Sequence, residues 1–313
     1  MIKIFKTFTD GMRTIDVPEK DCWISLIKPT EAELLEIANR YEIEPDDLRA
    51  ALDEEERSRI ESEDNYTMVL VDIPSIERRN DKDWYVTEPL GIILTKEAII
   101  TICLEETPVL SAMKNKRSHE FHTHMKTRFV LQILYRNASL YLQYLRSIDK
   151  KSEEVERKLH DSTQNRELIE LLELEKSLVY FTTSLRSNEV VLEKLLKVES
   201  VKKYPEDTDL LEDVIVENRQ AIEMANIYSG ILSGMMDAFA SVISNNLNIV
   251  MKFLAIVTIV LSVPTMIFSA YGMNVSMDGM PFSNVWYGFP LIILISIALS
   301  VIVALFFIKK KMY

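Results

Sequence analysis

Two long stretches without any charge, 253–270 and 289–308, constrain the fold of this chain more than any other feature. A helix rises about 1.5 Å per residue, so about 20 residues cover the roughly 30 Å hydrocarbon core of a bilayer. We therefore predict two transmembrane helices, at about 248–270 and 289–308. Charge is dense elsewhere, because residues 1–244 carry 47 of the 48 acidic and 32 of the 36 basic residues, a net charge of −15.

The few charges around these stretches predict how they cross the membrane. Lys252 begins the first stretch, Lys309–Lys311 follow the second, and the connection between them holds only Asp278. Positive residues flank transmembrane helices mainly on the cytosolic side. We therefore expect a multi-pass protein of the cell (inner or plasma) membrane with both termini in the cytoplasm. The connecting loop, at about 271–288, then faces outward, and 309–313 form a basic cytosolic tail.

The net charge and the cysteines exclude other classes of protein. An acidic chain lacks the basic face that displaces counterions from phosphates, which argues against a nucleic-acid partner. Cys22 and Cys103 form no CxxC pair, so we expect two reduced thiols in a cytosolic core. The first 16 residues lack the apolar stretch of a signal peptide. GxGxxG, P-loop and GxSxG motifs are absent from the sequence, and we predict no enzymatic activity.

Residues 1–108 have the pattern of a compact α/β domain, in which β-rich runs alternate with turn signals and helical patches. Pro45 lies in the first turn of one such patch, where proline is tolerated. The strands that we predict are 66–73, 85–94 and 98–104, and the helices are 31–43 and 44–61. Together they indicate a sheet with flanking helices.

Helices of unusual length are expected after this domain, because proline and glycine are absent from Val109 until Pro205 and Gly230, respectively. Apolar residues recur at spacings of three and four, which predicts a hairpin of about Ser118–Leu159 and Thr163–Val198. A further helix from about Thr208 is expected to run unbroken into the first transmembrane stretch. It would contain about 60 residues and measure roughly 90 Å.

The predicted fold class is α+β in the cytosol and all-helical in the membrane. We expect a cytosolic α/β domain at 1–108, a cytosolic long-helix stalk at 109–247 and a transmembrane domain at 248–313. The stalk helix would link the cytosolic and membrane regions mechanically.

Four hydroxyl residues share one face of the first predicted transmembrane helix. They recur at i, i+4, i+7 and i+11, as Thr258, Ser262, Thr265 and Ser269. Two interpretations remain open: such hydroxyls commonly bond their own i−4 carbonyls or pack against a neighbouring helix, and polar side chains at membrane depth also line water-filled paths. One such face per chain cannot enclose a path, so the second interpretation predicts a homo-oligomer.

Metal-ligating side chains occur in two patterns. The string SHEFHTH brings together His119, His122 and His124, but it is not HExxH and no cysteine accompanies it, so we interpret it as a solvated helix start rather than a zinc site. Hard divalent cations prefer carboxylate oxygens. The acidic candidates, although most such residues are plain surface, are Asp81, Asp83, Glu88, Asp213 and Asp237.

A series of short motifs surrounds the first transmembrane stretch. Tyr271-Gly272-Met273-Asn274 stands at its predicted outer end, the string 248–254 reads Asn-x-x-Met-Lys-x-Leu, and Ser233–Asp237 reads Ser-Gly-x-x-Asp. A proline lies within the first stretch, and a short loop, a second stretch and a basic end follow. This order of motifs resembles the CorA family of magnesium channels. The resemblance covers essentially the whole chain.

This resemblance implies a homopentameric funnel whose first transmembrane helices line a central pore. Gly272, Met273 and Asn274 would then form the selectivity filter. Mg²⁺ gives up its water reluctantly, so a ring of neutral oxygens from Asn274 and the Gly272 backbone would hold the hydrated ion. Gly272 would also permit an open turn at the mouth.

Further positions carry over from the family pattern. Asn248 would form a second polar ring, Met251 and Leu254 an apolar constriction, and Asp237 an acidic ring near the inner entrance. The four hydroxyl residues would line the pore between these rings and the filter. The implied partners are other copies of the chain, the lipid bilayer and divalent cations.

Regulation and ion capture carry over less completely. Asp213 matches a helix aspartate that helps to bind regulatory Mg²⁺ between neighbouring protomers, and its partner stays open among Asp81, Asp83 and Glu88. Many family members carry Met-Pro-Glu-Leu in the outer loop, where this chain has 280–283 with no glutamate. Asp278 is the alternative outer charge.

The function implied is membrane-potential-driven Mg²⁺ uptake, with Co²⁺ or Ni²⁺ as secondary ions and inhibition by cytosolic Mg²⁺. Mg²⁺ is both the transported and the regulatory ion, and no other cofactor is expected. Two alternatives remain: a zinc transporter on the same scaffold, with or without coupling to protons, and a membrane-anchored scaffold that conducts nothing. Zinc-moving relatives tend to carry GIN in place of GMN, so Met273 favours magnesium.

Overall fold

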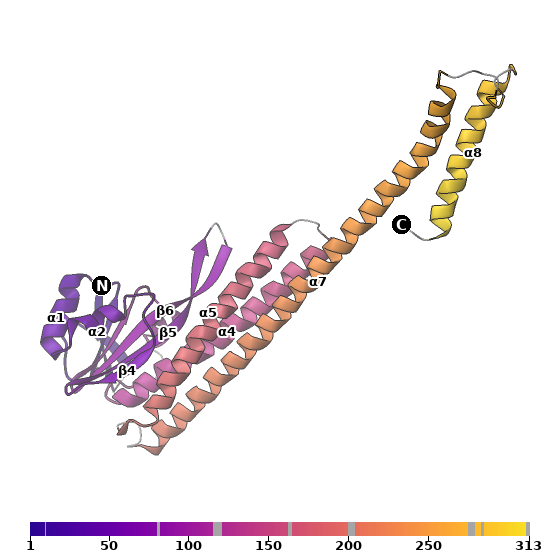
Figure 1. Cartoon of the computed structure of the whole chain (residues 1–313). Coiled ribbons are helices and arrows are strands. Elements are labelled where there is room, and N and C mark those ends of the chain that lie inside the picture. The colour runs from indigo at the N-terminus through magenta and orange to yellow at the C-terminus, as the bar shows by residue number, and fades with distance from the viewer. Residues whose placement is uncertain are drawn as a thin grey trace. The chain divides into compact units, whose positions relative to one another are not determined.

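A seven-stranded mixed sheet organises the N-terminal part of the computed structural model (Figure 1). The strand order is β2-β1-β3-β7-β6-β5-β4, in which the β3–β7 pair is parallel and the other neighbouring pairs are antiparallel. The strands are β1 (Ile2–Phe8), β2 (Gly11–Ile15), β3 (Cys22–Ile27), β4 (Arg59–Ser62), β5 (Tyr66–Arg79), β6 (Lys82–Thr95) and β7 (Ala98–Cys103).

Two short helices lie between β3 and β4, and the remaining helices follow β7. They are α1 (Glu31–Tyr41), α2 (Pro45–Ala50), α3 (Pro108–Ser111), α4 (Lys126–Asp161), α5 (Asn165–Leu195), α7 (Pro205–Tyr271) and α8 (Gly288–Lys309). The structure describes residues 1–9, 11–79, 82–114, 121–161, 165–199, 204–274, 279–282 and 285–310, without the side chains of 160, 161 and 165. The chain divides into two compact units, Met1–Gly234 (the first unit) and Met235–Tyr313 (the second unit).

Successive residues of the central strands point to opposite faces of the sheet and build two separate cores. In β5, Val69 and Val71 contribute to the core shared with α4, α5 and the beginning of α7, whereas Met68 and Leu70 contribute to the core shared with α1 and α2. Helices therefore cover both faces, as Figure 1 shows. Both thiols predicted to lie in the core, Cys22 and Cys103, are buried and free.

The three predicted strands are confirmed, and two of them are longer than expected. β5 and β6 each contain 14 residues, because they form one long hairpin with register from Tyr66↔Thr95 to Arg79↔Lys82. The first predicted helix is also confirmed as α1. Its start is fixed by a capping box, in which the Thr30 side chain accepts from the Glu33 N–H and the Glu33 carboxylate accepts from the Thr30 N–H.

The second predicted helix is wrong beyond Ala50. α2 stops there, and Arg59–Ser62 instead form β4, which pairs with β5 at the edge of the sheet. The Arg59 guanidinium bonds the carboxylates of Glu56 and Glu61 at 2.7 and 2.8 Å. The charged residues that suggested a helix therefore cover a sheet edge, where charge discourages pairing with another chain. Strand pairing outweighs local propensity here.

The helices α4 and α5 contact the sheet through the backbone of Asp72 in β5. The residue opposite Asp72 in β6 is Pro89, which has no N–H to donate. Asn188 of α5 fills the role of a strand residue: its amide accepts from the Asp72 N–H at 2.9 Å and donates to the Asp72 carbonyl at 2.8 Å. Asn137 and Tyr141 of α4 donate to the same carbonyl at 2.9 and 3.2 Å.

The predicted helical hairpin and the long helix after it are both confirmed. α4 begins later than expected, at Lys126, because Thr123 is tied to β1: Thr123 and Thr7 exchange two N–H to Oγ1 bonds, each 3.1 Å. α7 continues for 67 residues with Pro264 inside it. The helix predicted to lead from the cytosolic region into the first membrane stretch is therefore one continuous helix.

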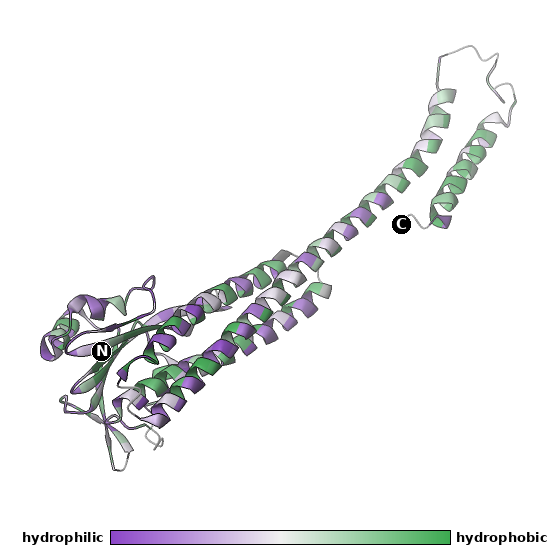
Figure 2. Cartoon of the chain, turned by 60° about the horizontal axis from the view of Figure 1, so that its bottom comes forward, coloured by the Kyte–Doolittle hydropathy of each residue, from purple (hydrophilic) through white to green (hydrophobic). Residues whose placement is uncertain are grey.

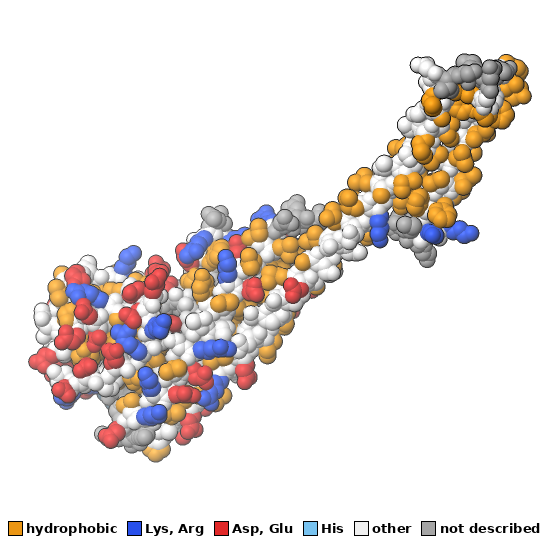
Figure 3. Space-filling model, viewed as in Figure 1, with side chains coloured by type: hydrophobic (Ala, Val, Ile, Leu, Met, Phe, Trp, Pro, Cys, Tyr) orange, Lys and Arg blue, Asp and Glu red, His pale blue; other side chains and the backbone are white. Residues whose placement is uncertain are grey.

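The second unit consists mainly of the C-terminal part of α7 and the whole of α8. Both helices are long and apolar enough to cross a membrane, and 0% and 6% of their most apolar windows are buried within the chain. Hydrophobic residues dominate these segments in Figure 2, whereas the acidic and basic side chains in Figure 3 gather on the first unit. This agrees with the two predicted transmembrane helices.

Candidate ion pathway and acidic sites

The predicted filter residues, Gly272–Asn274, follow directly on the last residue of α7, Tyr271. The Gly272 N–H donates to the carbonyl oxygens of Phe268 and Ser269, at 2.9 and 3.2 Å, and so continues the hydrogen bonding of the helix. All three filter residues are exposed in the single chain. The amide of Asn274 and the backbone oxygens beside it therefore lie just beyond the C-terminal end of a long helix.

Gly272, expected to permit an open turn at the mouth, directly follows the last residue of α7. Gly272 does not adopt the left-handed backbone that an open glycine turn uses, because among the described glycines only Gly11 has a positive φ. A Cβ on Gly272 would instead lie 3.3 Å from the Phe268 carbonyl oxygen. Space beside the last turn of α7, rather than backbone freedom, favours glycine here.

The four hydroxyl residues lie on one face of α7, where they line a shallow hollow together with Leu261 and Met266. Three of them bond their own helix: Thr258 donates to Leu254 O at 2.8 Å, Ser262 to Ile259 O at 2.8 Å, and Thr265 to Leu261 O at 3.0 Å. The hydroxyl protons are thus used within the helix, as one of the two interpretations expects. The oxygens keep lone pairs that can accept hydrogen bonds from water.

The residues expected further along the pore are exposed as well. Met251 and Leu254 are 59% and 52% exposed, and Asn248 and Asp237 are exposed. A large apolar side chain at this exposure, in a segment with almost no burial, needs lipid or another protein surface to cover it. The single chain therefore supplies a face, and the structure does not by itself enclose a path.

Asp213 points away from the core of its own chain. Its α7 neighbours Leu211, Val214 and Ile215 are buried, whereas Asp213 is exposed. A carboxylate in this position is available to a cation or to another chain. Two candidates, Asp81 and the outer charge Asp278, lie outside the described residues.

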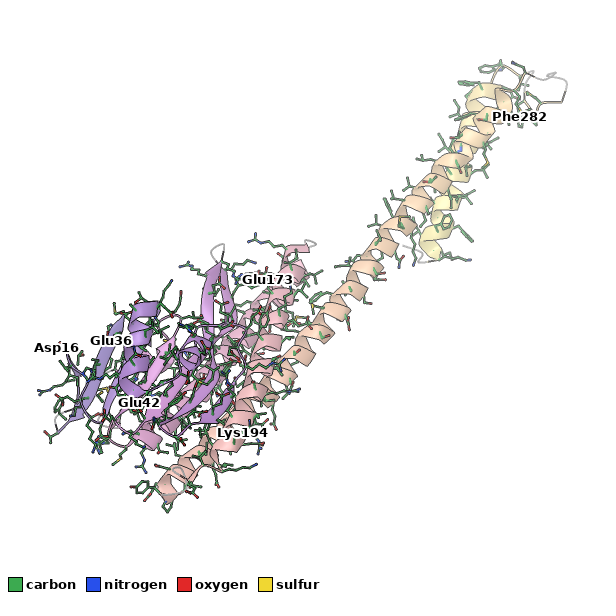
Figure 4. All side chains as sticks on the ribbon, turned by 60° about the vertical axis from the view of Figure 1, so that its left-hand side comes forward. Asp16, Glu36, Glu42, Glu173, Lys194 and Phe282 are labelled. Carbon is green, nitrogen blue, oxygen red and sulfur yellow. The ribbon has the colours of Figure 1, made fainter. Side chains whose placement is uncertain are left out.

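Asp83 and Glu88, both in β6, have different surroundings. Asp83 is exposed and forms an ion pair with Lys151 of α4 at 3.3 Å. The two residues are 68 positions apart in the sequence, so no local sequence signal reveals this pair. Beside it, Lys82 lies 3.6 Å from Glu173 of α5, the residue labelled in Figure 4. Asp83 thus belongs to a charged patch between the β5–β6 hairpin and the two helices.

Glu88 is half-buried, and burial raises the pKa of its carboxyl group above the ordinary value. A hydrogen bond with Ser75 opposes the rise, and the charges of Glu105, Glu54 and Glu77 add to it. A carboxylate that lies among other acids gains from a bound divalent ion. Within the described residues of one chain, no three His, Cys, Asp or Glu side chains cluster closely enough to hold a metal.

The histidines give no support to a zinc site within the described residues. His119 lies outside them, and the rings of His122 and His124 are 5.2 Å apart between centroids in a loop before α4. Thr123 between them is buried and bonded to β1. This segment attaches the loop to the sheet.

Comparison with known proteins places the chain in one family. The family model for the CorA-like Mg²⁺ transporter protein matches residues 19–310. The chain belongs to the CorA family. A curated CorA relative, the cobalt/magnesium transport protein of Methanocaldococcus jannaschii, is 29% identical over 295 residues, which cover 91% of this chain and 88% of the relative.

Solved structures agree with this assignment. The complete structure of the CorA magnesium transporter from Methanocaldococcus jannaschii matches 99% of this CorA-family chain and 96% of its own chain, with a TM-score of 0.80 and 26% identity. The cytoplasmic domain of ZntB from Vibrio parahaemolyticus matches 78% of this chain and 96% of its own, with a TM-score of 0.56 and 13% identity. The second likeness shows a shared fold only.

Proposed function

We propose that this CorA-family chain forms a channel for hydrated Mg²⁺, with Co²⁺ and Ni²⁺ as secondary ions. The observation that carries the proposal is the continuity of α7: one helix bears the hydroxyl face and leads directly into Gly272–Asn274. The matching family model is described as a Mg²⁺ transporter, and the 29% identical relative as a cobalt/magnesium transport protein. Both support the choice of ion.

The pathway requires several copies of the chain, and we propose a homopentamer with 248–313 as its membrane domain and 1–108 and 109–247 as its cytosolic domain and stalk. Each copy contributes one hydroxyl face, and the exposed side chains of Met251 and Leu254 become rings when copies surround an axis. Such apolar rings can close a pore by dewetting. Asn248 and Asp237 form a polar and an acidic ring around the same axis.

The filter works through neutral oxygens. A ring of Asn274 amides, with the backbone oxygens of Gly272, holds Mg²⁺ through its retained water shell, because complete dehydration of this ion is costly. Neutral donors bind the ion strongly enough to admit it and weakly enough to release it. Met273 and the outer charge of Asp278 complete the mouth. In the inner part of the pore, the oxygens of Thr258 and Thr265 accept hydrogen bonds from the hydrated ion.

The membrane potential supplies the driving force. With Lys252 and Lys309 on the cytosolic side, both termini lie in the cytosol and the outer loop faces outward. A potential of 100 mV is worth about 2.3 kcal/mol per elementary charge, and therefore about 4.6 kcal/mol for a divalent ion. Inward movement of Mg²⁺ then needs no chemical energy source.

Cytosolic Mg²⁺ regulates the channel between neighbouring protomers. Asp213 is exposed on α7, and Asp83 and Glu88 lie on β6, so carboxylates of two copies can share an ion. Residues 1–244 carry a charge of −15 per chain, and bound Mg²⁺ neutralises part of the repulsion between copies. High cytosolic Mg²⁺ holds the pentamer symmetric and closed, and low Mg²⁺ loosens it. Asp81 is the further candidate ligand.

The test is ion uptake into liposomes that contain the purified protein. Under an imposed negative interior potential we expect Mg²⁺ entry that is lost in Asn274→Ala and kept in Asn246→Ala, a control amide on the face of α7 away from Asn248. Unchanged flux in Asn274→Ala would contradict the pore assignment. Proton-dependent Zn²⁺ entry without Mg²⁺ flux would identify the zinc-transporting alternative, and absence of any flux would identify a non-conducting scaffold.

The regulatory site has its own test. Asp213→Lys should abolish inhibition of uptake by Mg²⁺ on the cytosolic side while the pentamer stays intact by size-exclusion chromatography with light scattering. Glu212→Lys changes the same charge one residue away on α7, where the side chain is also exposed, and serves as the control. Equal loss of inhibition in both variants would show that general charge, and not a site at Asp213, is responsible.

A further inference from the structure

A hydrogen bond ties the loop after α7 to the end of the helix. The Tyr271 hydroxyl donates to the carbonyl oxygen of Pro281 at 2.7 Å, across ten residues of chain. Tyr271 is the last residue of α7, and the filter residues Gly272–Asn274 follow it immediately. The bond therefore joins the two sides of the segment that carries the filter.

The next residue, Phe282, has an unusual backbone. Its φ is 63°, which makes it the only non-glycine residue with a positive φ among the described residues of the second unit. A bulky residue in this conformation is strained and keeps it only when its surroundings enforce it. Figure 4 shows Phe282 where the chain passes from α7 to α8.

Gly288, at the start of α8, makes room for this conformation. A Cβ at position 288 would overlap the Phe282 carbonyl oxygen and lie 3.3 Å from its carbonyl carbon. Only glycine allows the two segments to approach so closely. At Gly279, by contrast, a Cβ would meet nothing within 4 Å.

Tyr271, Phe282 and Gly288 also line an open, largely apolar hollow of about 650 Å³ between the C-terminal end of α7 and the start of α8. Tyr271 and Gly272 line it from the α7 side, Phe282 from the loop, and Phe289 and Ile292 from α8. The bond from Tyr271 to Pro281 lies at the exposed edge of this hollow. The loop is thus held at Pro281 by Tyr271 and at Phe282 by Gly288.

We infer that Tyr271 is a positioning residue of the filter: its bond to Pro281, together with the close approach of Phe282 to Gly288, fixes where Gly272–Asn274 stand. The inference rests on the proposed channel function and adds to it the device that sets the filter geometry. Because Asn274 is only three residues from Tyr271, release of the clamp changes how well a ring of amides fits a hydrated ion. Gating in the first unit is not affected.

Tyr271→Phe in the full-length protein tests this. The variant keeps the ring and loses the donor to Pro281. We expect the external Mg²⁺ concentration for half-maximal uptake to rise about three- to tenfold, which corresponds to the loss of one hydrogen bond, and the maximal rate to stay within about twofold. External block by hexaamminecobalt(III), an inert mimic of a hydrated ion, should weaken in parallel. Inhibition by cytosolic Mg²⁺ should be unchanged. Tyr287→Phe, at the start of α8, is the control.

A second pair of variants keeps the inference testable if Tyr271→Phe does not assemble. Gly288→Ala should raise the half-maximal concentration in the same direction, because its Cβ displaces the Phe282 carbonyl, and Gly279→Ala should not. Unchanged half-maximal concentration and block in Tyr271→Phe, or equal behaviour of the two glycine variants, would overturn the inference while Asn274→Ala still abolishes uptake. Normal uptake in Asn274→Ala would overturn the channel itself, and the inference with it.

Discussion

Two tryptophans stand in opposite environments in the two units. Trp23 in β3 is 0% exposed, stacks on Phe5 with ring centroids 4.9 Å apart, contacts Phe129 of α4 at 5.2 Å, and donates its indole N–H to Thr101 Oγ1 at 2.9 Å. Trp286, before α8, is 93% exposed. Other residues of the chain cover the whole surface of Trp23, whereas they leave almost the whole surface of Trp286 uncovered.

Polar groups differ between the units in the same way. In the first unit they connect distant elements: Asn188 of α5 bonds Asp72 of β5, and Arg128 of α4 pairs with Asp207 of α7. In the second unit the hydroxyls of Thr258 and Thr265 bond carbonyls of their own helix. The first unit is therefore specified inside one chain, whereas the apolar helices of the second leave surface that other molecules must cover.

The largest effect that separates the units should come from the two tryptophans. Trp23→Ala removes a fully buried side chain, which costs about 3–5 kcal/mol and lowers the midpoint of thermal unfolding by roughly 6–20 °C. Trp286→Ala should change that midpoint by less than about 2 °C. Circular dichroism of the full-length protein in detergent measures both. A larger loss for Trp286→Ala would mean that the second unit contains a core that one chain completes.

A second, smaller contrast concerns buried and exposed ion pairs of the first unit. Asp207 is 4% exposed and lies 2.8 Å from Arg128, whose side chain is 33% exposed. Arg128→Met strands a buried carboxylate, and we expect a cost of about 2–3 kcal/mol, below that of a fully buried pair because Arg128 reaches solvent. Arg219→Met removes pairs to Glu189 and Glu193 on the surface and should cost much less, because solvent screens exposed pairs.

The control for this contrast is salt. At 1 M NaCl the difference between Arg219→Met and the parent protein should vanish, since exposed pairs are screened. The difference for Arg128→Met should persist in the same thermal measurement. If both differences vanished together, Asp207 would be solvated rather than buried.

Two threonines give a still smaller contrast. Thr101 in β7 is buried and accepts the indole N–H of Trp23, so Thr101→Val leaves that donor unpaired at a cost of about 1–2 kcal/mol. Thr265 donates to its own helix at Leu261 O, so Thr265→Val should change stability by less than about 0.5 kcal/mol. It should nevertheless lower Mg²⁺ uptake into liposomes, because one ring of oxygens is lost. Normal uptake would remove Thr265 from the proposed pathway.

The difference between the units also decides what the sequence could predict. Charge-free length predicts the two apolar helices, and the absence of breakers predicts α7, because both depend on local chain properties alone. The motif at Tyr271–Asn274 points to the family because it is a short, continuous string of residues. The edge strand β4 was missed, since its residues resemble a helix until pairing with β5 is considered.

Contacts between distant residues could not be predicted from sequence. The pairing of Asp83 with Lys151, and the clamp from Tyr271 to Pro281, join residues whose spacing carries no periodic signal. The hydroxyl face was recognised by its period, but whether its hydroxyls bond the helix or a neighbour depends on rotamers. The spacing of the hydroxyl residues predicts only that more than one copy is needed, and the proposed number of five comes from the family resemblance.

The smallest expected effect is a pH dependence of the first unit, where burial raises the pKa of the Asp72 carboxyl group above its ordinary value near 3.8, against hydrogen bonds from Ser184 and Ser58. A raised pKa means that the folded state binds the proton more tightly than the unfolded state. This contribution to stability is complete below the unfolded pKa and is lost as the pH rises through the folded pKa.

Asp72→Asn removes this titration, and the amide is close to isosteric with the carboxyl group. From pH 4 upward, the stability of the parent protein should therefore fall relative to that of Asp72→Asn, and the difference should level off above the folded pKa. Thermal unfolding of both proteins across pH 4–7 measures the difference, in which the other carboxylates cancel. Asp64→Asn, in the turn between β4 and β5, is the control at an exposed site. Parallel curves for the parent and Asp72→Asn would contradict this prediction. They would show that the hydrogen bonds with Ser184 and Ser58 fully offset the effect of burial on the pKa of Asp72.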